Sequence, residues 1–537
     1  MHDTTNASID RISRRRLLAL AGGATAATAL GPAHIAAQQT PDAIPAVVEF
    51  PLPSTLAADA SPEFQAVADA LVETMRRYRV PGAALGIIAG GREEHATFGI
   101  ASISSLAPVT ADTVFQIGSL SKTHTATAIW SLIDQGALAL DAPVRTYIPD
   151  LRLADDSVAA EVTVGNLLDH TAGWFGDDVF DTGDGDDAIA RYVADRLPTM
   201  PRLFPLGDFF SYNNSAFILQ GRLIEVATGA PYNVAMENLL FAPLGLTDSL
   251  LDRTAVRQRP YTDAHVALPI NGRDVVAIQT PLWTPRSLVP AGGIWSTTRD
   301  VLRYARFHLA AGATPAPAGV VSRSASVVSS ESLLQMREPS MDIPGLPLSI
   351  GRSWFLQDVD GVNVFTHNGA TLGQGAELVA IPEHDFALVV LANSSAGGLT
   401  AMDVIDAALA SYPGLEALSG KVGILHAFLA PADAQPVTLP PKKLAEYVGR
   451  YAAPGVSYSV APRNGALELD TEPVEAIDTV QAAIQPMPTA PIPTPIDFLA
   501  EDEGVGGGLR FPFVRDDAGR VGWFSAGARL LPRVAGS

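Results

Sequence analysis

The chain contains no cysteine among its 537 residues. This absence excludes disulfide scaffolds, cysteine nucleophiles and thiolate metal sites together. Lysine is also rare, because Lys122, Lys421, Lys442 and Lys443 are the only lysines among 36 basic residues. Arginine keeps its proton inside proteins, whereas a buried lysine can lose it. A lysine in so arginine-rich a chain is therefore a candidate for proton-transfer chemistry.

Basic residues are fewer than acidic residues in the chain as a whole. The 36 basic residues stand against 57 acidic ones, which gives a formal net charge of −21. Such a chain repels phosphate backbones, so we expect no nucleic-acid partner. Hydrophobic residues make up 47% of the sequence. Together with the length, they supply a large core and exclude a mostly disordered protein.

Long hydrophobic runs are absent too. Residues 1–37 combine adjacent arginines at 14–16 with a mild run at 17–30 that is rich in alanine and glycine. The run is shorter than the about 20 residues that a spanning helix needs. This pattern is typical of a twin-arginine export signal. We therefore expect an exported, extracytoplasmic protein (periplasmic, cell-surface or secreted) with no integral membrane span in the mature chain.

Composition divides the remaining chain into four parts. Residues 38–61 are rich in proline and alanine and are predicted to form a linker, followed by a main domain at 62–412. A second linker is predicted at 413–440. Residues 441–537 alternate short strand-like pieces with glycine and proline, which favours a small all-β domain.

The main domain opens with clear local signals. Ser61 can cap a helix that starts at Pro62 and ends before residue 81. A buried strand is predicted at 83–88. The apolar stretches 377–381 and 386–391 are expected to pair as a hairpin.

Ser119 and Lys122 form the first candidate catalytic pair. They stand three residues apart at the start of a predicted helix, so they share one face. A serine hydroxyl is a weak nucleophile until a base takes its proton, and a lysine in a dry pocket can be that base. In isolation the pair is weak evidence, because a surface helix with a polar face gives the same pattern.

Two later segments strengthen the case. Tyr212 and Asn214 offer a phenol and an amide, although a simple strand-end turn would look the same. His367, Gly369 and Ala370 lie beside predicted strands, where Gly369 would let a substrate approach the backbone closely. An ordinary Asn-Gly turn is the alternative there.

In this order, Ser-Leu-Ser-Lys, Tyr-x-Asn and His-x-Gly resemble the three motifs of the serine β-lactamase and penicillin-binding hydrolases. The class C β-lactamase, D-alanyl-D-alanine carboxypeptidase and esterase branch is the most similar. The resemblance covers about residues 62–410, with further matches at 80–83, 162–173, 243–246 and 291–297. It implies an α+β fold, in which an antiparallel sheet is flanked by helices and joined by a mainly helical subdomain.

The resemblance also implies roles for single residues. Ser119 would attack a carbonyl, and Lys122 and Tyr212 would share the proton transfers, with the identity of the base left open. Asn214 would position Lys122 and a substrate amide. The backbone N–H groups of Ser119 and Ala370 would form the oxyanion hole.

His367 departs from the family pattern. Penicillin-recognising members usually hold a lysine there, whereas histidine is largely neutral above pH ~6.5. The histidine therefore favours an esterase or amidase function over a β-lactamase function. His170 also stands out, but its motif resembles a structural turn in this family, so it is not a catalytic candidate.

The leading hypothesis is an exported serine hydrolase that acts through an acyl-enzyme. Its substrate would be a small-molecule ester, amide or peptide: an ester, a D-amino-acid peptide or amide, or a β-lactam or D-Ala-type compound. The alternatives are a catalytically silent peptide-binding or scaffold protein of the same fold, and a binding module formed by the C-terminal domain. No Gly-x-Ser-x-Gly or His-Glu-x-x-His motif occurs, and we expect no cofactor and no metal.

Two segments receive weaker assignments. The acidic stretch 177–187 lacks the spacing and the closing glutamate of a calcium loop, so a solvated loop is expected. The segment from Leu444 to Tyr451 resembles the start of a lipocalin-like β module. Tyr447 and Tyr451 are expected to pack in the core of that module.

Overall fold

The computed structural model describes residues 50–270, 273–311, 327–431, 433–463, 465–472 and 493–534. The predicted export signal and the first half of the first linker (residues 38–49) lie outside these ranges. None of the helices within them is both long and apolar enough to cross a membrane.

The main domain is built on one eight-stranded antiparallel sheet with the strand order β2-β1-β12-β11-β10-β9-β8-β7. Its central strand β12 is buried along its whole length, which explains the continuous apolar run from 386. The predicted hairpin is confirmed, since β11 and β12 pair from Gly375↔Ala392 to Ile381↔Phe386. The strands are β1 (Gly82–Ala89), β2 (Arg92–Gly99), β7 (Met341–Asp342), β8 (Ser349–Ile350), β9 (Phe355–Val359), β10 (Val362–Thr371), β11 (Gln374–Ile381) and β12 (Phe386–Ala392).

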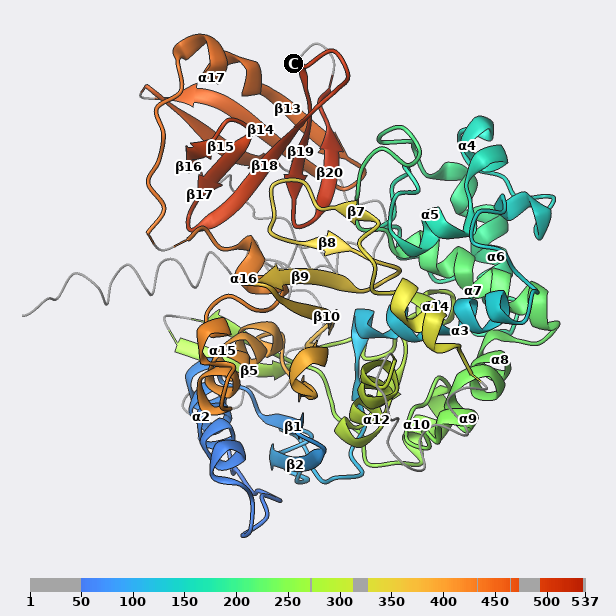
Figure 1. Ribbon diagram of the computed structural model, residues 1–537, viewed down its shortest axis with the longest axis vertical. Helices are drawn as coiled ribbons and strands as arrows, with labels where there is room; N and C mark the ends of the chain where they lie inside the picture. Colours follow the sequence, from blue (N-terminus) through green and yellow to red (C-terminus); the bar gives the residue numbers. More distant parts are fainter. Residues whose placement is uncertain are drawn as a thin grey trace, which may run out of the picture.

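Helices cover both faces of this sheet (Figure 1). On one face, α2 (Pro62–Tyr78) and α15 (Gly397–Ser411) share a core with apolar side chains of β1 and β12. On the other face, α12 (Thr298–Leu309) packs on the same two strands. Helix α2 starts as predicted, because the Ser61 hydroxyl accepts a hydrogen bond from the Phe64 amide at 3.2 Å.

The remaining elements of the main domain are mostly short helices, and many of them form the helical subdomain at the right of Figure 1. The helices are α3 (Ser121–Asp134), α4 (Asp156–Glu161), α5 (Val164–Leu168), α6 (Ala188–Asp195), α7 (Asn214–Thr228), α8 (Tyr232–Met236), α9 (Ala242–Leu244), α10 (Arg253–Arg257), α11 (Val289–Gly292) and α14 (Ser330–Gln335). A further helix, α16 (Ile424–Phe428), lies in the segment that was predicted to be the second linker. Two short ladders pair β3 (Phe115–Gln116) with β6 (Trp295–Ser296), and β4 (His265–Ile270) with β5 (Arg273–Ile278).

A separate all-β domain follows helix α17 (Pro441–Tyr447). Its eight strands pair in chain order, and an isolated bridge from Tyr451 to Arg533 joins its two ends into a near-barrel. Tyr447 and Tyr451 are fully buried in its core, as predicted. The strands are β13 (Gly449–Ala453), β14 (Val456–Arg463), β15 (Ala466–Glu472), β16 (Thr494–Ala500), β17 (Glu503–Gly506), β18 (Leu509–Arg515), β19 (Val521–Ala526) and β20 (Arg529–Pro532).

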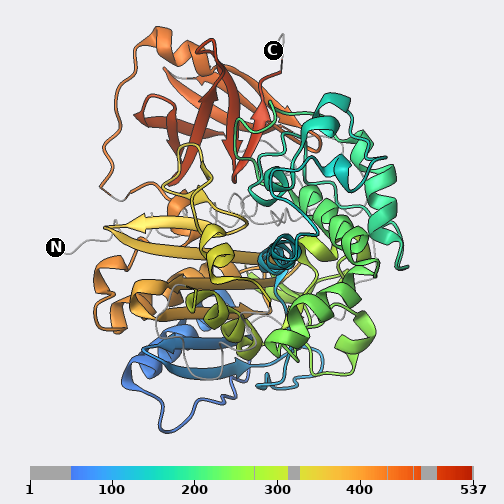
Figure 2. The ribbon, with the colours of Figure 1, turned by 45° about the vertical axis from the view of Figure 1, so that its right-hand side comes forward.

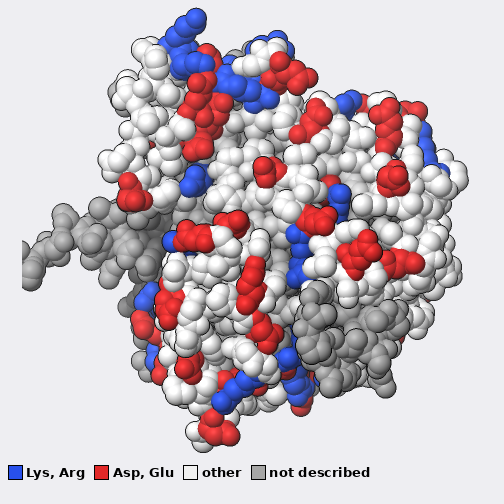
Figure 3. All heavy atoms as spheres, in the orientation of Figure 1, with Lys and Arg blue, Asp and Glu red and all other residues white. Residues whose placement is uncertain are grey.

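The β domain lies against β7, β8 and the helical subdomain in both ribbon views (Figures 1 and 2). One hydrophobic cluster joins Phe210, Ile343 and Leu348 of the main domain to aromatic side chains of the barrel. On the face drawn in Figure 3, acidic and basic groups are scattered over the surface. Apolar packing therefore joins the two domains, together with interdomain hydrogen bonds and an ion pair between Arg529 and Asp177.

Candidate active site

Ser119 lies in a single 3-10 turn, Gly118–Leu120, that leads directly into α3 at Ser121. The helix thus begins two residues later than Ser119. The serine is 4% exposed. Gly118 adopts a positive φ of 53°, and a Cβ there would lie 2.6 Å from the backbone nitrogen of Ala370. Glycine is therefore required for the turn to sit against β10.

Gly369 has the complementary role on β10. A Cβ at this position would lie 1.8 Å from the carbonyl oxygen of Ile117, which is far inside van der Waals contact. We expected this glycine to admit a substrate, but the close approach is made by the backbone of the chain itself. The consequence is that Ala370 is held beside the turn that carries Ser119.

Lys122 is completely buried on the first turn of α3. Its Nζ donates hydrogen bonds to Ser119 Oγ at 3.1 Å and to the Ala291 carbonyl at 2.7 Å. Burial lowers the pKa of Lys122 well below its usual 10.5, the Arg529 charge lowers that pKa further, and the Asp177 charge opposes the shift. Because a buried ammonium is costly, the neutral amine is favoured, and a neutral amine can accept a proton.

Tyr212 closes the other side of this pair. Its ring centre lies 4.8 Å from Lys122 Nζ, and the side chain is 3% exposed. Burial raises the pKa of the phenol well above its usual 10, although a hydrogen bond with Ser119 partly offsets this effect. The phenol therefore keeps its proton at neutral pH.

His170 supports Tyr212 from behind. The two rings stack with centroids 4.5 Å apart, and the His170 Nδ1 accepts a hydrogen bond from the Asn213 backbone N–H at 2.9 Å. Burial lowers the pKa of His170 well below its usual 6.5. The residue has a positive φ of 61°, which agrees with the structural turn expected from its motif.

Asn214 is the first residue of α7 rather than part of a strand. Its Nδ2 donates to Asp177 Oδ1 at 2.7 Å. Asp177 in turn pairs with Arg529, with 2.5 Å between Nε and Oδ2. Neither Asp177 nor Arg529 was among the predicted site residues.

The prediction of a solvated loop at 177–187 is wrong for its first three residues, because Val179 is also buried. The Asp177 side chain is 16% exposed and that of Asp178 is 2% exposed, and each forms an ion pair with an arginine. The partner of Asp177 lies 352 residues away in the sequence. No local pattern in the sequence could have indicated that contact.

His367 is fully buried on β10. Its Nδ1 lies 2.6 Å from the Asn368 carbonyl, while its Nε2 has no hydrogen-bond partner among the described residues. Burial lowers the pKa of His367 to about 3, and the nearby Lys122 adds to the effect. The ring is therefore neutral, and this strand position carries no cation.

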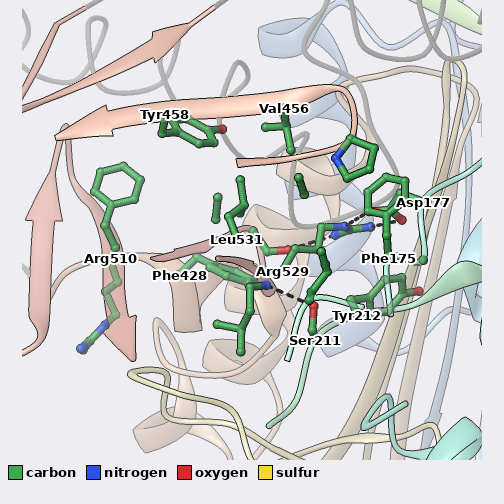
Figure 4. Close-up of a pocket in the computed structure, with 18 of the residues that line it drawn as sticks. Phe175, Asp177, Ser211, Tyr212, Phe428, Val456, Tyr458, Arg510, Arg529 and Leu531 are labelled. Atoms are coloured by element: carbon green, nitrogen blue, oxygen red, sulfur yellow. Dashed lines mark hydrogen bonds and ion pairs between the residues drawn. The ribbon is translucent and has the colours of Figure 1, made fainter. Parts of the chain in front are cut away.

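A pocket opens between the two domains next to Tyr212 (Figure 4). Ser119 is not part of its wall, whereas Tyr212 lines the pocket and also contacts both Ser119 and Lys122. The ion pair of Arg529 and Asp177 lines one side. Most other lining side chains are apolar and come from both domains, among them Phe175, Phe428, Val456, Tyr458 and Leu531. Across the described parts of the chain, no cluster of three His, Asp or Glu side chains could hold a metal ion.

Comparisons with known proteins agree with this geometry. A family model described as Beta-lactamase matches residues 67–411. Penicillin-binding protein 4 of Amycolatopsis lactamdurans is 33% identical over 368 residues, which cover 68% of this chain and 92% of that protein. Esterase EstB of Burkholderia gladioli is 32% identical over 238 residues, or 38% of this chain and 59% of the esterase. The crystal structure of SurE with D-Leu aligns with a TM-score of 0.68 at 26% identity, and it covers 88% of this chain and 99% of that chain.

Proposed function

The chain belongs to the beta-lactamase family, a family of serine hydrolases, and on this premise we propose that it hydrolyses an ester or amide through an acyl-enzyme on Ser119. The observation that carries the proposal is the contact of 3.1 Å between Ser119 Oγ and the fully buried Lys122 Nζ. A nucleophile and a base within this distance form the basic unit of covalent acyl transfer.

The proton transfers are assigned from the two opposite pKa shifts. Lys122 has its pKa lowered, so its neutral amine takes the Ser119 proton as the hydroxyl oxygen bonds to the substrate carbonyl carbon. Tyr212 has its pKa raised and therefore keeps its proton at neutral pH, and its hydrogen bond with Ser119 places the phenol where it can pass that proton to the leaving group. The N–H groups of Ser119 and Ala370 would then stabilise the oxyanion. Water hydrolyses the acyl-enzyme by the same steps in reverse order.

The substrate group that meets β10 is proposed to be uncharged. A substrate carboxylate there would need a cation, and His367 is neutral with a pKa of about 3. A β-lactam, with its carboxylate, therefore fits this position less well than a neutral ester or amide. The comparison with an esterase, EstB, favours the same choice.

The interdomain pocket is proposed to take an apolar part of the acyl group. We expect wild-type protein to hydrolyse nitrophenyl octanoate with a kcat/KM at least tenfold above that for the acetate, because each buried methylene contributes about 0.8 kcal/mol. Val456→Asp, which places a carboxylate in the pocket wall, should remove this preference while acetate hydrolysis persists. Steady-state kinetics over an acetyl-to-octanoyl series measures both effects.

Val437→Asp is the matched control, because Val437 is 45% exposed and does not line the pocket. It should keep the wild-type preference. An equal kcat/KM along the whole series in the wild type would show that the pocket holds no acyl group. Parallel assays with β-lactams, D-Ala peptides and D-amino-acid amides identify the substrate class.

Export completes the proposal. Residues 1–37 carry the arginine cluster and mild apolar run of a twin-arginine signal. We expect the protein expressed in a bacterial host to appear outside the cytoplasm, with cleavage near Gln38. Arg14→Lys combined with Arg15→Lys should retain it in the cytoplasm, and fractionation followed by N-terminal sequencing measures this. Unchanged fractionation of the double variant would exclude the twin-arginine route.

A further inference from the structure

The turn between β19 and β20 is bonded directly to the catalytic segment around Tyr212. The Tyr212 backbone N–H donates to the Ala528 carbonyl at 2.9 Å, and the Leu530 N–H donates to Ser211 Oγ at 3.1 Å. Ala528 adopts a positive φ of 63° in this turn. The C-terminal domain is thus fixed by its main chain on both sides of one residue, Arg529.

The Arg529 side chain extends from this turn into the main domain (Figure 4). Its guanidinium carbon lies 4.8 Å from the centre of the Tyr212 ring. Its Nε and Nη2 lie 2.5 and 3.2 Å from the two carboxylate oxygens of Asp177. Asp177 also accepts the hydrogen bond from Asn214. One arginine of the C-terminal domain therefore contacts Tyr212 directly and Asn214 through a single carboxylate.

The ion pair of Arg529 and Asp177 differs from ordinary surface pairs because it is shielded from solvent. The side chains of Arg529 and Asp177 are only 15% and 16% exposed. Removing one partner of a shielded pair leaves the other charge poorly solvated, which disturbs the local structure. In the same domain, the pair of Arg520 and Asp516 has 78% and 23% exposure, and exposed pairs of that kind contribute little.

We propose that the C-terminal domain completes the active site, with Arg529 as a positioning residue that packs on the Tyr212 ring and holds Asp177, and through it Asn214, in place. The proposal rests on the proposed function, because both concern the reaction at Ser119. It assigns the β domain a role in the chemistry rather than in an independent binding activity.

The electrostatic surroundings of Lys122 make this role measurable. Tyr212, His170 and His367 face the amine and are neutral at pH 7, since burial shifts each of their pKa values away from the charged form. The charged groups that act on the amine are Arg529, which lowers its pKa, and Asp177, which raises it. The two substitutions that neutralise these groups should therefore shift the Lys122 pKa in opposite directions.

The direction in which each substitution shifts the pH profile follows from the role of Lys122 as a base. The base must be deprotonated, so kcat/KM rises with pH through its pKa. Arg529→Gln removes a nearby positive charge that lowers the Lys122 pKa. The acidic limb of the pH profile, which is the range where kcat/KM rises with pH, should therefore move to higher pH. Asp177→Asn removes the negative charge that raises the Lys122 pKa, so the limb should move to lower pH.

The test measures pH profiles of kcat/KM for nitrophenyl acetate on full-length variants. We expect Arg529→Gln and Asp177→Asn each to lower the maximum by about tenfold to 10²-fold, as small misplacements of catalytic groups do. Arg529→Lys should recover part of the loss, because it keeps the charge but not the planar fork. The matched control is Arg520→Gln, which removes an exposed arginine of the same domain and should leave the profile unchanged.

Three outcomes of these pH profiles decide whether Arg529 acts as a positioning residue. Opposite shifts of the acidic limb, with a loss at both positions, support the proposal. Profiles of Arg529→Gln and Asp177→Asn within about twofold of Arg520→Gln would overturn it, as would limbs that move in the same direction. Should Arg529→Gln not fold, Asp177→Asn tests the shift to lower pH, and Arg529→Lys, which keeps the charge, tests whether the maximum falls without a shift. Activity that survives Ser119→Ala would instead overturn the proposed function, so the two failures are distinguishable.

Discussion

Ser119→Ala is expected to abolish hydrolysis of every ester and amide substrate. The substitution removes one oxygen, so the fold should be kept, but no atom remains to form the acyl-enzyme. Loss of a nucleophilic serine lowers kcat by about 10⁶-fold in another serine hydrolase. The same variant should no longer be labelled by a serine-directed phosphonate probe. Hydrolysis of a nitrophenyl ester and mass spectrometry of the labelled protein measure the two effects.

Ser131→Ala provides the control for this experiment. Ser131 lies on the same helix and is 1% exposed, but its hydroxyl accepts a hydrogen bond from Gln135 rather than facing Lys122. It should keep both turnover and labelling. Phosphonate labelling that persists in Ser119→Ala would place the nucleophile elsewhere and remove the basis of the proposed mechanism.

The parts of the fold that were predictable depend on neighbours in the sequence. Ser61 caps α2 because its hydroxyl reaches an amide three residues on, and such a contact is encoded locally. The same reasoning placed Ser119 and Lys122 on one face, since residues three apart adjoin each other in a helical turn. The order of the three motifs then indicated the family and the antiparallel sheet.

The parts that were missed depend on contacts between distant segments. Gly369 looked like a site of substrate approach, but the atom beside it is the carbonyl oxygen of Ile117. The acidic stretch at 177 looked solvated because its partner, Arg529, belongs to another domain. Charged residues are usually exposed unless they are paired. The pairing, and with it the role of the C-terminal domain, becomes visible only in the folded chain.

Lys122→Arg is expected to reduce kcat/KM by about 10³-fold, within the range that general base catalysis contributes. An arginine keeps the positive charge but cannot lose its proton, so it cannot accept the proton of Ser119. The site also leaves little room, because the rings of Tyr212 and Phe217 lie 4.8 and 5.6 Å from Lys122 Nζ. We therefore expect kcat/KM to fall although the positive charge at position 122 is kept.

The pH profile separates the base from a purely electrostatic lysine. In the wild type, kcat/KM should rise with pH through the lowered pKa of Lys122 and reach its maximum well below the usual value of 10.5. In Lys122→Arg this rise of kcat/KM with pH, the acidic limb of the profile, should disappear. Lys421→Arg is the matched control, because Lys421 is 51% exposed and pairs with Asp360 at the surface. A Lys122→Arg enzyme that stayed within about tenfold of the wild type, with the limb intact, would show that position 122 needs only a charge and that another group takes the proton.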